Sequence, residues 1–259
     1  KYILMESNIL SNSTDVETCH EISKTSDVPE TDITLKQFFA DTSKIALPGI
    51  LFYASIVMLQ FTNLLFIGKY YDNTDMLNGI GISNLYMNCT LFAIMQGLVS
   101  GLEPLCSNAL GQKKYKLIGI YKHRASIIGY SAVTIIVIIH FFTARHFIRI
   151  FDISEEGFNY AERYFYVCLI YVFFDVQSSV NIRFLNVIGK PHISFFISLG
   201  GCLLHPLWDY IFIGILDLDV LGAGIAFIIS RFIIFLATTL YINIANPLPE
   251  SNFWINKYL

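Results

Sequence analysis

The stretch from Ala125 to Ala144 reads ASIIGYSAVTIIVIIHFFTA and contains no Asp, Glu, Lys or Arg. A helix needs about 20 apolar residues to cross the hydrocarbon layer of a membrane. Two other stretches, Ile45–Gly68 and Met76–Leu102, are equally devoid of charged residues. Several such stretches in one chain are not expected of a soluble core, so the sequence predicts an integral membrane protein.

The composition of the whole chain agrees with this prediction. Of its 259 residues, 54% are hydrophobic and only 14% are charged, whereas a soluble domain needs more charged residues on its surface. The formal net charge of −3 and the lack of a basic tract argue against a nucleic-acid partner. The cysteines inside apolar stretches lack metal-ligand spacing, so we expect no metal and no cofactor. They are Cys89, Cys106, Cys168 and Cys202.

The pattern of apolar stretches and breaks predicts an all-α membrane protein with six transmembrane helices. The first three helices are clear from their long uncharged stretches, whereas the last three are interrupted by Asp175, Asp209 and Arg231 in turn. Turn residues at Gly189–Pro191 and at Asp217–Gly222 separate these later helices. The six predicted helices are Ile45–Gly68, Gly79–Ala109, Gly119–Ala144, Arg163–Ile188, Pro191–Leu216 and Leu221–Ala245.

Polar segments flank this helical region of residues 45–245. Residues 1–44 are rich in Ser, Thr, Asp and Glu, and we expect a disordered tail. Residues 246–259 are expected to form a linker. Cytoplasmic loops of membrane proteins carry an excess of Lys and Arg, and here nine such residues fall on one side against four on the other. Both termini are therefore expected to be cytoplasmic. The nine are Lys36, Lys44, Lys113, Lys114, Lys116, Lys122, Arg124, Arg183 and Lys190, and the four are Lys69, Arg145, Arg149 and Arg163.

Small residues and one proline indicate how the helices pack. Gly97 and Gly101 form a G-x-x-x-G pattern, which lets two membrane helices approach closely. Further candidates for such contacts are Gly200, Gly201, Gly222 and Gly224. Pro206 lies inside the fifth predicted helix and leaves the carbonyl of Cys202 without its helical partner. Such a break is tolerated where it is buried in protein or faces a wet cavity.

Several segments of the sequence resemble motifs of the multidrug and toxic compound extrusion (MATE) family, and they occur in the same order and at the same spacing. Gly97–Gly111 reads GLVSGLEPLCSNALG and resembles the family signature at the end of the second helix. Arg183–Pro191 reads RFLNVIGKP and is similar to the loop between helices four and five. His205–Ile213 and Leu221–Ala226, which read HPLWDYIFI and LGAGIA, fit helices five and six. The resemblance covers nearly all of the apolar region.

This resemblance implies one six-helix lobe of a two-lobe transporter. The implied activity is secondary active efflux of organic compounds by antiport with protons or sodium, and the buried acidic residues favour cationic substrates. The expected partners are the small-molecule substrate, the lipid bilayer and a second six-helix lobe, either in the same full-length chain or in a second copy. The expected location is a plasma or vacuolar-type membrane. Without the second lobe, the face that bears Asp209, His205 and Asp175 would be turned toward lipid.

Asp209 is the leading candidate for a cation or proton site, because an ionisable group inside the hydrocarbon layer is costly and usually functional. Asp209 and Asn63 each lie 18 residues into their predicted helices (209 − 191 and 63 − 45). Both are therefore about 27 Å from the cytoplasmic end. His205 lies four residues before Asp209, on the same helix face. The resemblance places a cation-coordinating cluster at the positions of Asn63 and Asp209. Prokaryotic members commonly carry Asp where this sequence has Asn63, which argues against tight sodium binding.

Other polar residues within the predicted helices are candidates for a cavity or a gate. Arg231 is expected about 15 Å deep from the outer surface, close enough to form a structural ion pair with Asp209. Asp175 is either a cavity-lining acid that attracts cations or a hydrogen-bonded tie between helices. Glu103 matches the acidic position of the family signature and is expected to brace an inner gate. Gln60 either lines the cavity or bonds across helices.

Functions of other classes fit the sequence less well. It contains no H-E-x-x-H, G-x-S-x-G, P-loop or G-x-G-x-x-G motif, which argues against an enzyme. A membrane scaffold or receptor has little reason to carry buried ionisable residues at matched depth. A lipid-linked sugar flippase of the same superfamily would carry more basic residues in its cavity than the single Arg predicted here.

Overall fold

The computed structural model describes residues 35–251 of the chain. Contacts divide the chain into two units, residues 1–44 and residues 45–259, and the helical lobe belongs to the second unit. The helices are α2 (Leu35–Tyr71), α3 (Thr74–Tyr86), η1 (Met87–Phe92), α4 (Ala93–Ser100), α5 (Leu102–Gly111), α6 (Tyr115–Ile148), α7 (Glu155–Cys168), α8 (Tyr171–Val187), α9 (Pro191–Asp209), η2 (Tyr210–Ile215), α10 (Asp219–Ala245) and η3 (Pro249–Ser251).

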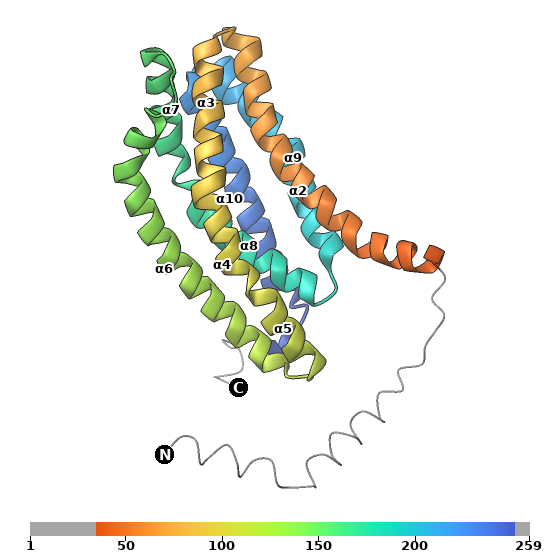
Figure 1. Cartoon of the computed structure of the whole chain (residues 1–259). Helices are drawn as coiled ribbons and strands as arrows, with labels where there is room; N and C mark the ends of the chain where they lie inside the picture. Colours follow the sequence, from red (N-terminus) through yellow and green to blue (C-terminus); the bar gives the residue numbers. More distant parts are fainter. Residues whose placement is uncertain (1–34, 252–259) are drawn as a thin grey trace, which may run out of the picture. The chain divides into compact units, whose positions relative to one another are not determined.

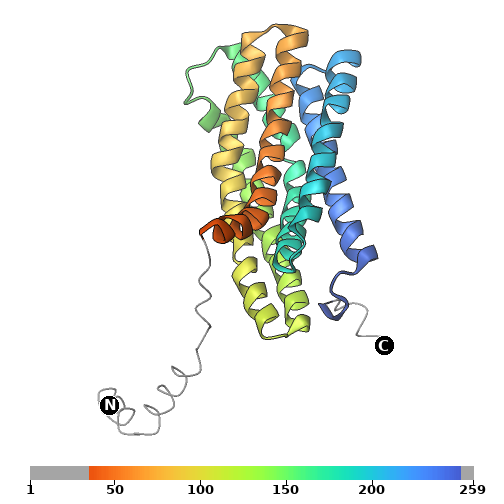
Figure 2. The ribbon, with the colours of Figure 1, turned by 90° about the vertical axis from the view of Figure 1, so that its right-hand side faces the viewer.

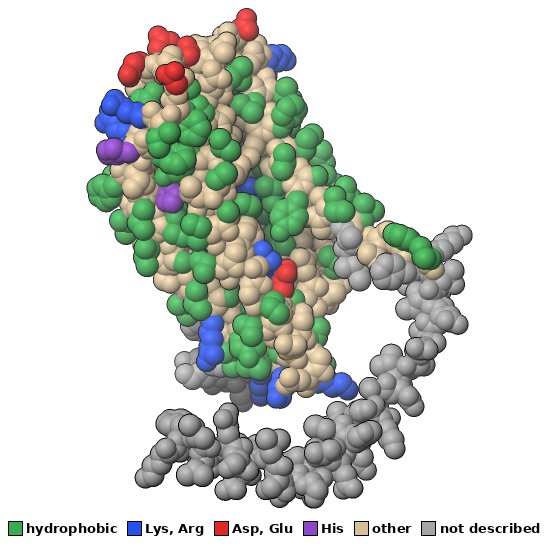
Figure 3. All heavy atoms as spheres, viewed as in Figure 1, with side chains coloured by type: hydrophobic (Ala, Val, Ile, Leu, Met, Phe, Trp, Pro, Cys, Tyr) green, Lys and Arg blue, Asp and Glu red, His purple; other side chains and the backbone are tan. Residues whose placement is uncertain are grey.

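These helices provide six spans, as the sequence predicts. Five helical segments, counting α3–α5 and α9–η2 each as one, are long and apolar enough to cross a membrane, and the pair α7 and α8, bent by 50°, provides the sixth. In Figure 1, α8 and α10 lie between α9 on one side and α6 and α7 on the other, and Figure 2 shows the same lobe turned by 90°. Figure 3 shows apolar side chains spread along the whole length of this face, while most of the visible carboxylates gather at its upper end.

The predicted helix boundaries are wrong at several ends. The first helix begins at Leu35, so the predicted disordered tail of residues 1–44 is wrong for residues 35–44, which are helical. The remainder of that tail, residues 1–34, lies outside the described part of the chain. The fourth predicted helix, Arg163–Ile188, is two helices, and the first of them begins at Glu155. Its start has an ordinary N-cap, because the Ser154 side chain accepts a hydrogen bond from the backbone N–H of Gly157.

The predicted break at Gly189–Pro191 is confirmed. Gly189 has φ of 77°, a left-handed conformation that glycine adopts without steric cost. It ends α8 after Val187, and Pro191 then occupies the first turn of α9, where its missing N–H has no helical partner to lose. This tight connection sets α9 beside α8 at the start of its path through the lobe.

Close packing between helices depends on glycines other than the predicted pair. Gly97 and Gly101 are exposed, and no residue of another described helix lies within 4 Å of the Cβ position at either one, so the predicted G-x-x-x-G contact is absent from the described lobe. At Gly201, by contrast, an added Cβ would lie 2.6 Å from Ile234 Cγ1. This close approach draws α9 against α10 one turn before His205.

A pair of glycines in α3 gives a first test of the packing. A Cβ at Gly79 would lie 2.8 Å from the carbonyl oxygen of Gly157 in α7. This oxygen is a backbone atom, so a side-chain rotation cannot relieve the clash. We expect Gly79→Ala to cost about 1–3 kcal/mol of unfolding free energy. At Gly81, two residues along the same helix, nothing lies within 4 Å, so Gly81→Ala is expected to stabilise by up to about 1 kcal/mol. Thermal unfolding of the two variants in detergent compares them, and equal stabilities would contradict this packing.

Candidate functional site

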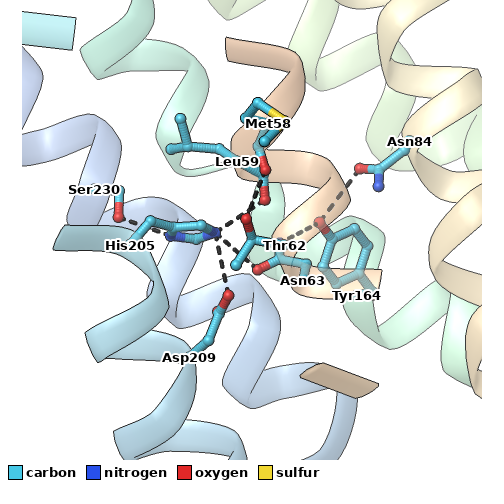
Figure 4. Close-up of polar contacts among 9 residues, drawn as sticks. All are labelled: Met58, Leu59, Thr62, Asn63, Asn84, Tyr164, His205, Asp209 and Ser230. Atoms are coloured by element: carbon cyan, nitrogen blue, oxygen red, sulfur yellow. Dashed lines mark hydrogen bonds and ion pairs between the residues drawn. The ribbon is translucent and has the colours of Figure 1, made fainter. Parts of the chain in front are cut away.

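Three helices bring a set of polar side chains together inside the lobe. Asn63 lies on α2, His205 and Asp209 lie on α9, and Ser230 lies on α10, and all four are fully buried. Figure 4 shows their side chains converging on the His205 ring. The structure therefore brings together Asn63, His205 and Asp209, the residues that the sequence predicts to share one site.

The α9 backbone is irregular at this point. Pro206 follows His205 and has no N–H for the carbonyl of Cys202. Asp209 is the last residue of α9, and the next six residues, Tyr210–Ile215, form the π-helical turn η2. π-Helical turns widen a helix and occur frequently at functional sites. The change of helix type begins at the residue after Asp209, the candidate ion-binding residue.

The contacts of His205 indicate which of its ring nitrogens carries the proton. Nε2 lies 3.0 Å from the carbonyl oxygen of Leu59 and 3.0 Å from Oδ1 of Asn63. A backbone carbonyl only accepts hydrogen bonds, so we assign the proton of the neutral ring to Nε2. Nδ1 lies 2.9 Å from the hydroxyl of Ser230, which donates to the neutral ring and accepts from the charged one. Both charge states of His205 therefore have hydrogen-bond partners.

Asp209 has fewer partners than its burial requires. Its Oδ2 lies 3.5 Å from His205 Nε2, and neither carboxylate oxygen accepts a hydrogen bond from any residue in 35–251. A buried charged carboxylate without hydrogen bonds is costly. A bound proton or a small cation removes this cost. The carbonyl oxygen of Leu59 and Oδ1 of Asn63, each 3.0 Å from the same His205 Nε2, are oxygen atoms of the kind that coordinate a small cation.

A hydrogen-bonded chain extends from this site across the lobe. Asn63 donates through Nδ2 to the Tyr164 hydroxyl at 3.3 Å, and that hydroxyl donates to Oδ1 of Asn84 at 3.3 Å. The chain fixes the Asn63 amide with its oxygen toward His205. Tyr164 and Ser230 were not among the predicted site residues, because nothing in the sequence distinguishes them from other polar residues in apolar helices.

The predicted ion pair between Arg231 and Asp209 is wrong. Arg231 Nη1 instead donates to Asp175 Oδ1 at 2.8 Å, and both side chains are buried. The rings of Tyr171 and Phe227 lie beside the guanidinium, at 5.7 and 5.0 Å. The prediction compared depth in the membrane and ignored direction around the helix. Neighbouring residues of a helix point about 100° apart, and Ser230 already faces His205, so Arg231 faces α8.

The remaining predicted residues lie apart from the Asp209 cluster. Gln60 and Asn88 exchange two hydrogen bonds, at 3.2 and 3.1 Å, between α2 and η1. Glu103 pairs with Arg183 at 3.1 Å, between α5 and α8. The sequence predicts Arg183 as a positive charge on the inner side, whereas in the structure only 9% of this residue is exposed.

The expectation that Asp209, His205 and Asp175 line a face open to lipid is also wrong. Their exposed fractions are 0%, 0% and 3%. Contacts within the described lobe cover all three. The helices of this single lobe thus enclose the ionisable residues without help from another lobe.

Six spans enclose a buried carboxylate, and the helix that carries it changes from α to π form at the next residue, an arrangement that fits one lobe of a membrane transporter. A family model described as MatE matches residues 48–211, more than half of the chain, and the chain belongs to this family. Among curated relatives, Protein DETOXIFICATION 5 of Arabidopsis thaliana is 28% identical over 70% of this chain and 38% of its own length. Protein DETOXIFICATION 6 of the same plant is 27% identical over 70% of this chain and 37% of its own length.

Solved structures share the fold of the lobe. The eukaryotic MATE transporter AtDTX14 matches with a TM-score of 0.74 and 19% identity over 81% of this chain and 46% of that chain. A MATE structure in the bent conformation matches with a TM-score of 0.73 and 17% identity over 78% of this chain and 45% of that chain. The chain thus spans less than half the length of the relatives it matches.

Proposed function

We propose that this lobe is one half of an ion-coupled efflux transporter that carries organic cations out of the cytoplasm. The observation that carries this proposal is the buried Asp209, which lies beside His205 and lacks hydrogen-bond partners among the described residues. A carboxylate in this setting binds and releases a proton or a sodium ion as its surroundings open to one side or the other. Membership of the MATE family supports transport of this kind.

The coupling step depends on what each residue does when the ion leaves. With a proton or cation bound, Asp209 is neutralised and remains stable inside the lobe. When the ion leaves, Asp209 carries the negative charge, and the Nε2–H of the neutral His205 ring, 3.5 Å from Oδ2, is the donor that can turn to it. Ser230 continues to donate to Nδ1, so the ring keeps a partner on its other side. Ion release therefore shifts the Nε2–H from the Leu59 and Asn63 oxygens on α2 to Asp209 on α9, and these are the contacts we expect to differ between transport states.

The proposed transport also needs a second lobe. In alternating access, two bundles rock against each other around a site between them. The described helices form one such bundle, and the curated relatives are more than twice as long as the matched region. The second bundle is therefore proposed to lie in a longer chain or in a second copy of this one. Both termini of the present chain are proposed to be cytoplasmic. The proposed location is a plasma or vacuolar-type membrane.

Transport by purified forms of the chain tests this proposal. Liposomes that contain the 259-residue chain are given a proton gradient or, separately, a sodium gradient, and uptake of a fluorescent organic cation is followed. We expect no gradient-driven uptake by a verified monomer, and uptake by a crosslinked dimer or by a chain extended with a second lobe. Uptake by the monomer would contradict the need for a second lobe. A lack of uptake by every form, under both gradients, would contradict the proposed function.

A further inference from the structure

A second polar site lies in a cavity of about 150 Å³ near the start of α9. Residues from α2, α4, α5, α8 and α9 line it, and none of them belongs to the Asp209 cluster. Its polar lining includes Gln96, Glu103, Ser179, Arg183 and Ser194. Asn186 is a further polar residue of the lining, and the rest of the wall is formed by Gly49, Phe52, Tyr53, Ile182 and Pro191. The Asp209 mechanism gives this cavity no role.

Arg183 is the central residue of the cavity. Only 9% of the residue is exposed. Its Nη1 lies 3.1 Å from Oε1 of Glu103, and its Nη2 donates to Oε1 of Gln96 at 2.8 Å. Its Nε has no hydrogen-bond partner within the described chain, although it is buried. One donor of the guanidinium is thus available for a further acceptor.

The two partners of this ion pair differ in how easily they leave it. The side chain of Glu103 is 42% exposed, whereas that of Arg183 is 11% exposed. Glu103 therefore rotates into water at little cost, and a half-exposed ion pair contributes little stability. Arg183 stays behind as a buried charge, which is expensive without a counter-ion. An anion that enters the cavity has to displace only the more exposed of the two charges.

Further donors in the cavity also favour an anion. Ser194 is 2% exposed, and its hydroxyl has no hydrogen-bond partner in the described residues. The Ser179 hydroxyl accepts from Gln96 Nε2, which leaves its own hydrogen to donate. Ser194 and Pro191 lie in the first turns of α9, where the helix carries partial positive charge. Once Glu103 turns away, the guanidinium is the one remaining full charge among the lining residues, and both hydroxyls can donate to an anion beside it.

From this arrangement we infer an organic carboxylate site in which Arg183 binds the carboxylate of the ligand and Glu103 is a displaceable internal substitute for it. The apolar wall of Phe52, Tyr53 and Ile182 fits an aromatic or aliphatic body attached to that carboxylate. Bidentate binding of carboxylate is the geometry to which a guanidinium is suited. The cavity is inferred as an anion site apart from the path of the organic cation, so this inference does not rest on the proposed transport function.

The test measures binding, not transport, so its failure differs from failure of the proposed function. The purified 259-residue chain in detergent is titrated with benzoate, benzylammonium and benzyl alcohol, which share a ring and differ in charge. We expect benzoate to bind and the other two to bind more weakly. Arg183→Gln should weaken benzoate by more than about tenfold, because a charge-assisted hydrogen bond is lost. Glu103→Gln should tighten benzoate by about fivefold, because a half-exposed internal competitor is removed.

The gain in Glu103→Gln is the decisive result, since a damaged fold does not improve binding. If that variant does not purify, Glu103→Asp replaces it, because its shorter side chain reaches Arg183 less well and should give a smaller gain in the same direction. Equal benzoate affinity in the wild type and Arg183→Gln would overturn the inference. Tighter binding of benzylammonium than of benzoate, or no gain in either Glu103 variant, would do the same.

Discussion

Replacing Asp209 by Asn is expected to reduce gradient-driven transport to the level of protein-free liposomes. The amide keeps the shape of the carboxyl group but neither ionises nor binds a cation with a full charge. The fold should be retained, because neither oxygen of Asp209 accepts a hydrogen bond from the described residues. The measurement is uptake of a fluorescent organic cation by the transporting form of the protein, with thermal unfolding measured alongside it.

Two further variants separate the role of Asp209 from a general effect of charge. Asp217→Asn removes the same charge from an exposed residue between η2 and α10 and should leave transport near the wild-type rate. His205→Gln removes the ring whose Nε2–H is proposed to donate to the charged Asp209, and it should impair transport strongly. Wild-type transport in Asp209→Asn would exclude this carboxylate from the mechanism. Equal losses in Asp209→Asn and Asp217→Asn would show that the effect is not specific to the site.

The largest loss of stability is expected when the pair of Asp175 and Arg231 is broken. The exposed fractions are 3% and 5%, and the hydrogen bond between them is 2.8 Å long. Removal of one partner leaves the other charged and buried, so Arg231→Gln and Asp175→Asn should each cost about 3–5 kcal/mol. Unfolding by heat or denaturant in a fixed detergent measures the change.

The double variant, Asp175→Asn with Arg231→Gln, tests the reason for that loss. It removes both charges and leaves two neutral polar groups, so most of the stability should return. A double variant that loses the sum of the two single costs would show that the side chains do not act as a pair. The double variant is also used to measure transport. If it transports with the same dependence on the ion gradient as the wild type, the pair has a structural role only.

The depth of each polar residue in the membrane could be predicted from the sequence, whereas the neighbouring helix toward which its side chain points could not. Asn63 and Asp209 were assigned the same depth by counting residues, and the structure joins both to His205. Arg231 was also placed at a compatible depth, yet it faces Asp175 on α8. A residue count gives the rise along a helix, but the facing direction depends on how each helix is rotated, which packing decides.

Packing also explains why the glycine prediction is wrong for Gly97 and Gly101 and confirmed for Gly201. Gly97 and Gly101 have the spacing of a contact motif, but no neighbouring helix of the described lobe covers them. Gly79 and Gly201 lack that spacing and are in close contact with other helices. The bend between α7 and α8 was missed for a related reason, because no Gly or Pro lies at residues 169 and 170 to indicate it. The contacts of Arg183 with Glu103 and Gln96 could not be predicted, because they depend on how α8 packs against α5 and α4.

The central claim is that Asp209 is a buried ion-binding carboxyl group, and infrared spectroscopy of the purified chain tests it directly. Difference spectra between acidic and alkaline pH are recorded for the wild type and for Asp209→Asn in lipid. We predict that a carboxyl band appears in the wild type when Asp209 is protonated and that this band is missing in Asp209→Asn. If sodium is the coupling ion, added sodium should replace the proton and remove the band. The same titrating band in both proteins would contradict the claim.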